Sequence, residues 1–365
     1  MNEELIRTTP ALEAACADAR AEGIVALDTE FVWSRTYLPR LGIVQMGCRA
    51  GCCALDCMCS MHTDPFASVV EDPSVVKILH DARQDLALIK HYSGASARNV
   101  FDTQLAAAFA GLPSGLGLQK LLFEVIDVGL AKTQTLTDWT QRPLTKAQLQ
   151  YALDDVRYLP DLRDALIARA KSLGTLGWLM EDLATYDGGV PSMEHNPEEA
   201  WKKVKTGHIR LDGRGRAILS ALAACREISA QEWNLPRNWL GDDASLAAMA
   251  ASASTSHLRH RLKGKGEILR GIYEKAIAAT KDLPEDEWPE DPHRHYISEV
   301  LSAADAAMDW LAQRAEEIHV DASVIASRAT VTAFVDDVND DANPLASGWR
   351  HEAVGKEMAS LFGVD

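Results

Sequence analysis

The segment GIVALDTEFV (23–32) constrains the fold more than any other part of this chain, because it is short, β-rich and mostly apolar, as a buried strand is. Strand patterns recur after it, at 41–47, 52–57, 75–81 and 99–103. Helical patterns precede and separate the strands, at 9–23, 85–92 and 104–110. Because the strands first follow one another directly and then alternate with helices, we predict an α/β fold in which helices flank a mixed sheet.

At 365 residues the chain is long enough for two or three domains. The strand patterns are confined to its first half. From about residue 195 Ala and Leu recur at helical spacing instead. The acidic, Pro-rich segment DLPEDEWPEDP (282–292) predicts a linker within this helical half. We therefore expect an α/β domain over 1–195, followed by two all-α domains over 197–281 and 293–365.

Two carboxylates interrupt the first strand pattern. Asp28 and Glu30 are two residues apart, so their side chains should project from one face of the strand. Neighbouring carboxylates in a buried site repel each other and lose hydration, and a divalent cation would remove both costs. The alternative is a polar sheet edge where both side chains face water.

A second pair of polar side chains lies on a predicted helix. Tyr151 and Asp155 are spaced i, i+4 and therefore share one helix face. This helix is expected to begin at the capping box Thr145-x-x-Gln148 and to break at Pro160. The alternative role of the pair is a Tyr packed on the core with an Asp at the solvent edge.

Two further aspartates stand at helix starts. Asp85 begins the helix that follows the fourth strand, where a carboxylate is favoured by the helix N-terminus without any metal. Asp102 lies at a junction from strand to helix, and we expect it to cap the next helix.

Taken together, three segments resemble the exonuclease motifs of the DEDD superfamily: LDTEF (27–31), HDARQD (80–85) and YALDD (151–155). The stretch 129–159 is similar to the ribonuclease D family, with Lys132, Asp138-Trp139 and Arg142-Pro143-Leu144. Another branch of the superfamily has His five residues before the last Asp. Here that position is Gln150, and Tyr151 follows it, so the chain resembles the tyrosine variant.

The resemblance implies a ribonuclease H-like exonuclease domain that removes nucleotides from the 3′ end and releases nucleoside 5′-monophosphates. Two divalent ions, magnesium or manganese, would be held by Asp28, Glu30, Asp85 and Asp155. Tyr151 would orient the attacking water. Oxygen ligands of this kind suit hard cations.

Four more residues receive expected substrate roles from the resemblance. Thr29 and Phe31 would contact the terminal nucleotide, with strand packing as the alternative for both. Lys132 and Arg142 would contact phosphates. For Arg142 an alternative is to hold its loop by bonding carbonyl groups.

The formal net charge of −16 is unusual for a nucleic-acid-binding protein, but phosphate contacts depend on local basic patches. Two such segments stand out, at 201–216 and 257–270. The side chains expected to contact RNA are Lys202, Lys203, Lys205, Arg210, Arg259, Arg261 and Lys263. The alternative is a solvated face without a partner.

The helical half also resembles a known module. Residues from Trp201 to about Lys281 are similar to an HRDC domain, a small helical domain that binds nucleic acid, although Cys225 stands where that family often has Trp. The segment 293–365 resembles a second HRDC-like domain. This arrangement favours RNA with a free 3′ end as substrate, including precursor tRNA.

Two other functions compete with this interpretation. One is a DNA 3′→5′ exonuclease of the same superfamily, similar to the Werner-syndrome exonuclease domain. The other is a non-catalytic RNA-binding protein with a decayed site. The presence of all four motif carboxylates and of Tyr151 argues against decay.

The cysteine pattern and the distribution of apolar residues bear on the cellular location of the protein. Five of the seven cysteines fall within 48–59, on one predicted hairpin, so we expect reduced apolar residues rather than a zinc site. No apolar run approaches the ~18 residues that span a bilayer, and the N-terminal segment lacks the apolar core of a secretory signal. We therefore expect a cytoplasmic monomer that does not bind membranes.

Overall fold

The computed structural model describes residues 4–130, 137–190, 193, 195–291 and 296–363. Its contacts divide the chain into two compact units. Unit 1 comprises Met1–Phe31, Leu41–Pro191 and Tyr296–Asp365, and unit 2 comprises Val32–Arg40 and Ser192–His295. None of the helices in the described ranges is long and apolar enough to cross a membrane.

Unit 1 is built on a sheet with the strand order β1-β4-β3-β2-β5-β6. The strands are β1 (Leu5–Ile6), β2 (Ile24–Val32), β3 (Arg40–Cys48), β4 (Gly51–Asp56), β5 (Val76–Leu79) and β6 (Val100–Asp102). β3 pairs with β4 in antiparallel orientation, whereas β1 with β4, β2 with β5, and β5 with β6 are parallel. The predicted mixed sheet is therefore confirmed.

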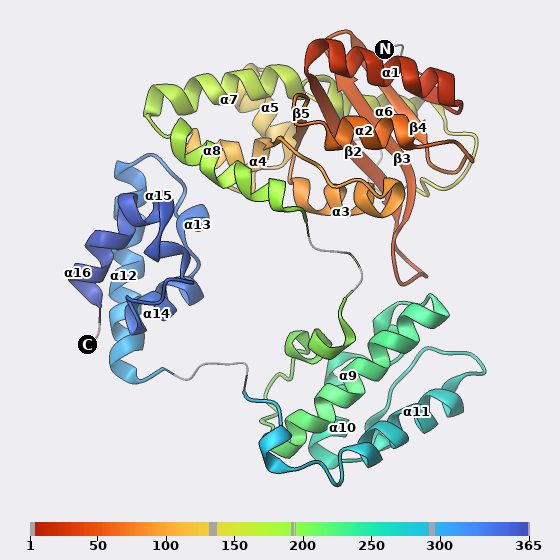
Figure 1. Ribbon diagram of the computed structural model, residues 1–365, viewed down its shortest axis with the longest axis vertical. Helices are drawn as coiled ribbons and strands as arrows, with labels where there is room; N and C mark the ends of the chain where they lie inside the picture. The colour runs from red at the N-terminus through yellow and green to blue at the C-terminus, as the bar shows by residue number, and fades with distance from the viewer. Residues whose placement is uncertain (1–3, 131–136, 191–192, 194, 292–295, 364–365) are drawn as a thin grey trace. The chain divides into compact units, whose positions relative to one another are not determined.

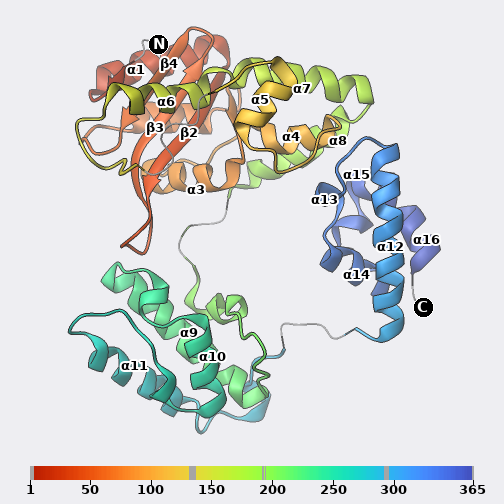
Figure 2. The same ribbon diagram turned by 180° about the vertical axis from the view of Figure 1, so that it is seen from behind.

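Helices cover both faces of this sheet. Figure 1 shows α1 and α2 over one face, and Figure 2 shows α6 over the other. The helices of this part are α1 (Thr9–Glu22), α2 (Asp64–Glu71), α3 (Ala82–Ser93), α4 (Thr103–Phe109), α5 (Leu118–Ile126), α6 (Lys146–Arg157), α7 (Leu159–Leu173) and α8 (Leu176–Ala184).

The helix boundaries follow their local signals closely. α1 stops at Gly23, which adopts a left-handed φ of 69° that few other residues tolerate. The capping box of α6 is formed: the Gln148 amide N–H donates to Thr145 Oγ1 at 3.2 Å, and Gln148 Oε1 accepts from the Thr145 N–H at 2.7 Å. Pro160 separates α6 from α7 as predicted, because it sits in the first turn of α7.

Two details differ from the expectation. α3 begins at Ala82 rather than at residue 85, so Asp85 lies inside its first turn. The Asp102 carboxylate accepts hydrogen bonds from the Asp81 and Ala82 amides, which fixes this earlier start. The short strand β1 was not predicted, because two residues are too few to show a periodic pattern.

The C-terminal helices are packed into unit 1. They are α12 (Ser298–Glu317), α13 (Ala322–Ile325), α14 (Arg328–Asp336), α15 (Gly348–Arg350) and α16 (Lys356–Phe362). The Trp349 ring lies against Phe109 and Trp178, with ring centroids 5.2 and 5.5 Å away. Trp349 Nε1 donates to Asp182 at 2.8 Å, and Arg350 donates to both oxygens of the same carboxylate. The segment 296–363 thus shares a core with α4 and α8.

Unit 2 is a small helical bundle of α9 (Gly213–Trp233), α10 (Asp243–Ser252) and α11 (Gly266–Ala279). Its core contains Trp201, Leu222 and Tyr273, and it also takes in Tyr37 from the segment between β2 and β3. Part of the expected linker packs here: Arg216 donates to the Pro289 carbonyl at 2.8 Å. The domain boundaries 1–195, 197–281 and 293–365 stay a prediction.

Candidate active site

Strand β2 and helix α6 bring three carboxylates together. Asp28 and Glu30 lie on one face of β2, because successive side chains alternate along a strand. Their carboxylate oxygens and one from Asp155 on α6 all lie within 4.8 Å of one another. The four residues before Asp28 are fully or almost fully buried, and the burial of this apolar segment fixes the position of the strand that carries the carboxylates.

The electrostatics of this cluster are unfavourable without a cation. Burial, followed by the charges of Asp155 and Asp85, raises the pKa of Glu30 to about 8. Burial and the neighbouring Asp154 raise the pKa of Asp155 to about 7. The pKa of Asp28 is raised as well, by burial and by the other three acids. Among the described residues no basic side chain pairs with Asp28, Glu30 or Asp155.

Asp85 lies beside this cluster rather than in it. It accepts a hydrogen bond from the Thr29 hydroxyl, which turns its carboxylate toward the strand. Its pKa is nevertheless raised to about 7, mainly by burial. The alternative role, an interaction with the N-terminus of α3, fits the same position in the first turn.

Gln45 is a residue of the site that sequence reasoning missed. It is fully buried on β3, and its Nε2 donates to Asp28 Oδ2 at 3.1 Å. The signal was present in the sequence, because Gln45 is the one amide in the apolar run LGIVQMG (41–47). A buried amide needs a polar partner, and here that partner is a motif carboxylate.

Tyr151 is on the same side of α6 as Asp155, as the i, i+4 spacing predicted. Its ring stacks on Trp139, with centroids 6.2 Å apart. Burial and the charges of Asp155, Glu30 and Asp28 raise the pKa of Tyr151 to about 12. The hydroxyl therefore keeps its proton at neutral pH and can donate a hydrogen bond near the carboxylates.

A second ion cluster holds the loop that carries Trp139. The Arg142 guanidinium bonds the carboxylate of Asp56 and the carbonyls of Gly42, Trp139 and Gln141, at 2.5 to 2.9 Å. These bonds engage all five N–H groups of a guanidinium. Arg142 thus bonds its own loop to β3 and β4, and its expected contact with a phosphate stays a prediction. Gly42 is required there, because a Cβ atom would come within 2.4 Å of the Trp139 carbonyl oxygen.

The other predicted residues occupy less informative places. Thr29 is buried and Phe31 is half-buried on β2. Lys132 lies outside the described residues. Asp102 caps α4 as expected, accepting from the amides of Gln104 and Leu105. The seven basic side chains expected to contact RNA are all exposed: Lys202, Lys203, Lys205, Arg210, Arg259, Arg261 and Lys263.

The donor set fits a divalent metal ion. Asp28, Glu30 and Asp155 offer oxygen ligands only, which suits hard cations. A cation would also remove the repulsion that raises their pKa values. The cluster therefore has both the geometry and the charge to hold a divalent ion.

Comparison with known proteins agrees with this site. The 3′-5′ exonuclease family matches residues 4–170. Ribonuclease D from Desulfotalea psychrophila is 38% identical over 69% of this chain and 68% of its own length. Ribonuclease D from Acidiphilium cryptum is 32% identical over 98% of this chain and 93% of its own length.

A solved structure extends the likeness to the whole fold. The crystal structure of Escherichia coli RNase D, described as an exoribonuclease involved in structured RNA processing, superposes with a TM-score of 0.86. It is 28% identical, and the match covers 99% of this chain and 98% of that one. The DNA exonuclease and the non-catalytic protein are therefore not favoured. Relatives matched along nearly their whole length, together with the carboxylates of all three motifs, place this chain in the ribonuclease D family of 3′→5′ exoribonucleases.

Proposed function

We propose that Asp28, Glu30, Asp85 and Asp155 hold two divalent ions, magnesium or manganese, and that the site hydrolyses the last phosphodiester of an RNA 3′ end. One observation carries this proposal: three carboxylates with oxygens within 4.8 Å lack a basic partner among the described residues. Bound ions would activate a water and stabilise the leaving 3′ oxygen. The product is a nucleoside 5′-monophosphate.

The protein side chains divide the remaining work. Asp85 is held by the Thr29 hydroxyl beside the three-carboxylate cluster, so it completes the ligand set from α3. Gln45 orients Asp28 through its amide. Tyr151 stays protonated because its pKa is about 12, and its hydroxyl donates a hydrogen bond that aligns the attacking water.

Substrate contacts are assigned near the same strand. Thr29 lies between Asp28 and Glu30 on β2 and Phe31 follows Glu30, and the family resemblance assigns both to the terminal nucleotide. For Thr29 the contact is made by the backbone, because its hydroxyl is occupied by Asp85. Lys132 is assigned to a phosphate by family resemblance alone.

The helical parts grip longer RNA. The exposed basic side chains of 201–216 and 257–270 supply phosphate contacts that a site for the last nucleotide lacks. The relative named above processes structured RNA, and we infer that precursor tRNA is among the substrates here. In this proposal a cytoplasmic monomer uses 1–195 for hydrolysis and 197–281 and 293–365 for binding.

The test uses 5′-labelled RNA, the matching DNA and a precursor tRNA with a 3′ extension, each with Mg²⁺, Mn²⁺ or EDTA. We expect stepwise shortening of RNA from the 3′ end with either metal, release of nucleoside 5′-monophosphates, and no reaction in EDTA. Faster shortening of DNA than of RNA would contradict the substrate assignment. Full activity in EDTA would contradict the metal site.

A further inference from the structure

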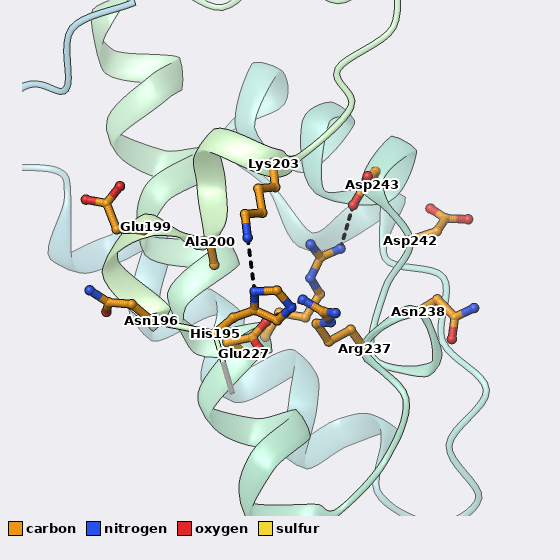
Figure 3. A pocket seen from close by; sticks show the side chains of 11 residues that line it. His195, Asn196, Glu199, Ala200, Lys203, Glu227, Arg237, Asn238, Asp242 and Asp243 are labelled. Carbon is orange, nitrogen blue, oxygen red and sulfur yellow. Dashed lines mark hydrogen bonds and ion pairs between the residues drawn. The ribbon is translucent and has the colours of Figure 1, made fainter. Parts of the chain in front are cut away.

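Unit 2 contains a pocket of about 500 Å³, which is within the size range of small-ligand sites. Its walls are the short helix η2 (Pro197–Lys203), the middle of α9, and the turn from η3 (Arg237–Trp239) into α10. Figure 3 shows the side chains of His195, Lys203 and Arg237 directed toward one another at its centre. The exonuclease reaction uses none of these three side chains.

The centre of the pocket is rich in nitrogen groups. Lys203 Nζ lies 3.1 Å from His195 Nδ1. Burial lowers the pKa of His195, and the charges of Arg237 and Lys203 lower it further. Three basic side chains that converge in this way repel one another when charged. An anion between them would remove that repulsion.

A fourth basic side chain lines the same pocket. Arg226 is only 7% exposed, and its Nη1 donates to the Gly241 carbonyl at 3.1 Å and to Asp243 at 2.9 Å. Its Nε is buried and has no partner in the described part of the chain. Buried donors almost always find an acceptor, so an unpaired one points to a ligand oxygen.

The acidic side chains around the pocket are already engaged. Each one has a partner. Glu199 pairs with Lys202 at 2.6 Å, and Asp242 accepts from the Ser245 amide at 2.8 Å. Glu227 accepts from the Tyr37 hydroxyl and lies 3.5 Å from Arg237, and Asp243 accepts from Arg226 and from the Lys205 amide. Figure 3 shows Glu199 and Asp242 turned away from the three central side chains. The groups left to meet a ligand are therefore mainly donors.

The pocket is also held in place before any ligand arrives. The His195 amide donates to the Tyr37 hydroxyl oxygen at 3.2 Å, and Gln231 donates to the His195 carbonyl at 3.1 Å. Arg237 is 3.5 Å from the buried carboxylate of Glu227. Side chains fixed in this way lose little entropy on binding.

We propose that this pocket binds a phosphate group, through Lys203, Arg237, His195 and the free Nε–H of Arg226. The phosphate belongs either to the backbone of bound RNA or to a free nucleoside 5′-monophosphate. Both sources present a tetrahedral phosphate with free anionic oxygens, and guanidinium and ammonium groups recognise such oxygens. The proposal goes beyond the exonuclease site, because the pocket would bind without a metal.

The first arm of the test titrates the full chain in EDTA with inorganic phosphate and with AMP, followed by the NMR signals of the His195 ring. Loss of one charged hydrogen bond should weaken binding about 10-fold in Lys203→Gln. Lys275→Gln removes the same charge from an exposed side chain of α11 that does not line the pocket, and it should leave the affinity for phosphate and AMP unchanged. Arg237→Gln should weaken binding at least as much as Lys203→Gln, with thermal unfolding as the check on its fold.

The second arm measures binding of a single-stranded RNA, again in EDTA. If an RNA phosphate occupies the pocket, Lys203→Gln weakens RNA binding more than Lys275→Gln does, and AMP competes. If a free nucleotide is the occupant, the variant weakens AMP alone. The proposal is overturned if neither phosphate nor AMP shifts His195, or if both lysine variants act equally. Because hydrolysis is not the readout, failure here is separate from failure of the exonuclease assignment.

Discussion

Two acidic sites in unit 1 differ in how their charge is compensated: one is the fully buried Asp56, and the other is the partly buried set Asp28, Glu30 and Asp155. Asp56, fully buried at the end of β4, is bonded by Arg142 and Arg7, and although burial opposes the shift these arginines lower its pKa to about 2. Asp28, Glu30 and Asp155 are bonded by no basic side chain in the described residues, and burial raises their pKa values. The protein itself compensates the charge of Asp56. The charges of Asp28, Glu30 and Asp155 would be compensated only by a bound cation.

This difference suits the Asp56 site to a structural role and the three-carboxylate cluster to a chemical one. Asp56, which is bonded by two arginines, fixes the position of the loop that carries Trp139, and the Trp139 ring stacks on Tyr151. A cluster of unpaired acids costs stability that the fold tolerates for the sake of chemistry. Breaking the first should cost mainly stability, and breaking the second should cost mainly activity.

The largest effect is expected from Asp155→Asn. It removes one ligand charge at nearly constant volume, and we expect hydrolysis to fall by at least about 10³-fold, as for loss of a group that stabilises transition-state charge. The matched control is Asp154→Asn on the next residue, whose carboxylate bonds Gln150 and Arg157 instead. Steady-state rates with Mg²⁺ compare the two. Equal losses would mean that the cluster is not the site.

Tyr151→Phe should slow the chemical step by roughly 10²–10⁴-fold, the range for a group that handles a proton. The ring can still stack on Trp139, so Mn²⁺ and RNA affinity should stay near wild type. Single-turnover kinetics measure the step directly. An unchanged rate would remove the hydroxyl from the mechanism.

Asp56→Asn tests the paired acid. Removing one partner of a buried ion pair leaves Arg142 without its counter-charge, and we expect a loss of about 3 kcal/mol in the free energy of unfolding. Asp305→Asn, which breaks an exposed pair with Arg328, is the control and should change little. Urea unfolding measures both. Similar curves for the two variants would show that burial of the pair does not matter.

Basic side chains that do not line the proposed phosphate pocket should have a smaller effect than the changes above, and the effect should be on RNA affinity. Replacing Arg259, Arg261 and Lys263 by Gln should lower RNA affinity about 10-fold. It should also reduce the slope of log affinity against log salt concentration by about 2, the value for three phosphate contacts to a single strand. Hydrolysis of a dinucleotide is the control and should be unaffected. An unchanged salt slope would make this segment a solvated face.

The smallest effect is a pH dependence of stability in EDTA. The raised pKa values of Glu30 (about 8) and of Asp85 and Asp155 (about 7) mean that the folded state binds more protons than the unfolded chain. Their contribution is fully present below pH ~4, the ordinary carboxyl range, and is lost as the pH rises to about 8. The melting temperature should therefore fall over this window, less so in Asp155→Asn. A wild-type profile identical to that of the variant would contradict the pKa assignment.

Sequence alone predicted the elements that depend on local signals. Apolar β2, the capping box of Thr145 and the break at Pro160 act within a few residues, so their pattern was enough. Strand and helix periodicity also placed Asp28 with Glu30, and Tyr151 with Asp155, on common faces. The structure brings the carboxylates of Asp28, Glu30 and Asp155 together, and their role as metal ligands stays a prediction from the family resemblance.

The rest depended on contacts between distant segments. The pairing of Arg142 with Asp56 spans 86 residues, and the approach of Gln45 to Asp28 needs two strands in register. The same holds for Trp349, which joins the C-terminal helices to Asp182 across 167 residues. No periodicity within a single element reveals such partners, so the roles of Gln45 and Asp182 emerged only from the fold.

Calorimetric titration of Mn²⁺ at pH 7 tests the central claim most directly, because that claim is that the unpaired acids of β2 and α6 are completed by cations. We predict binding to the wild type accompanied by proton release, since Glu30, Asp85 and Asp155 with pKa values near 7 to 8 must lose protons to become ligands. Buffers of different ionisation enthalpy reveal that release. In Asp28→Asn the affinity should drop steeply. Undiminished Mn²⁺ binding by Asp28→Asn, or wild-type binding without proton release, would contradict the account.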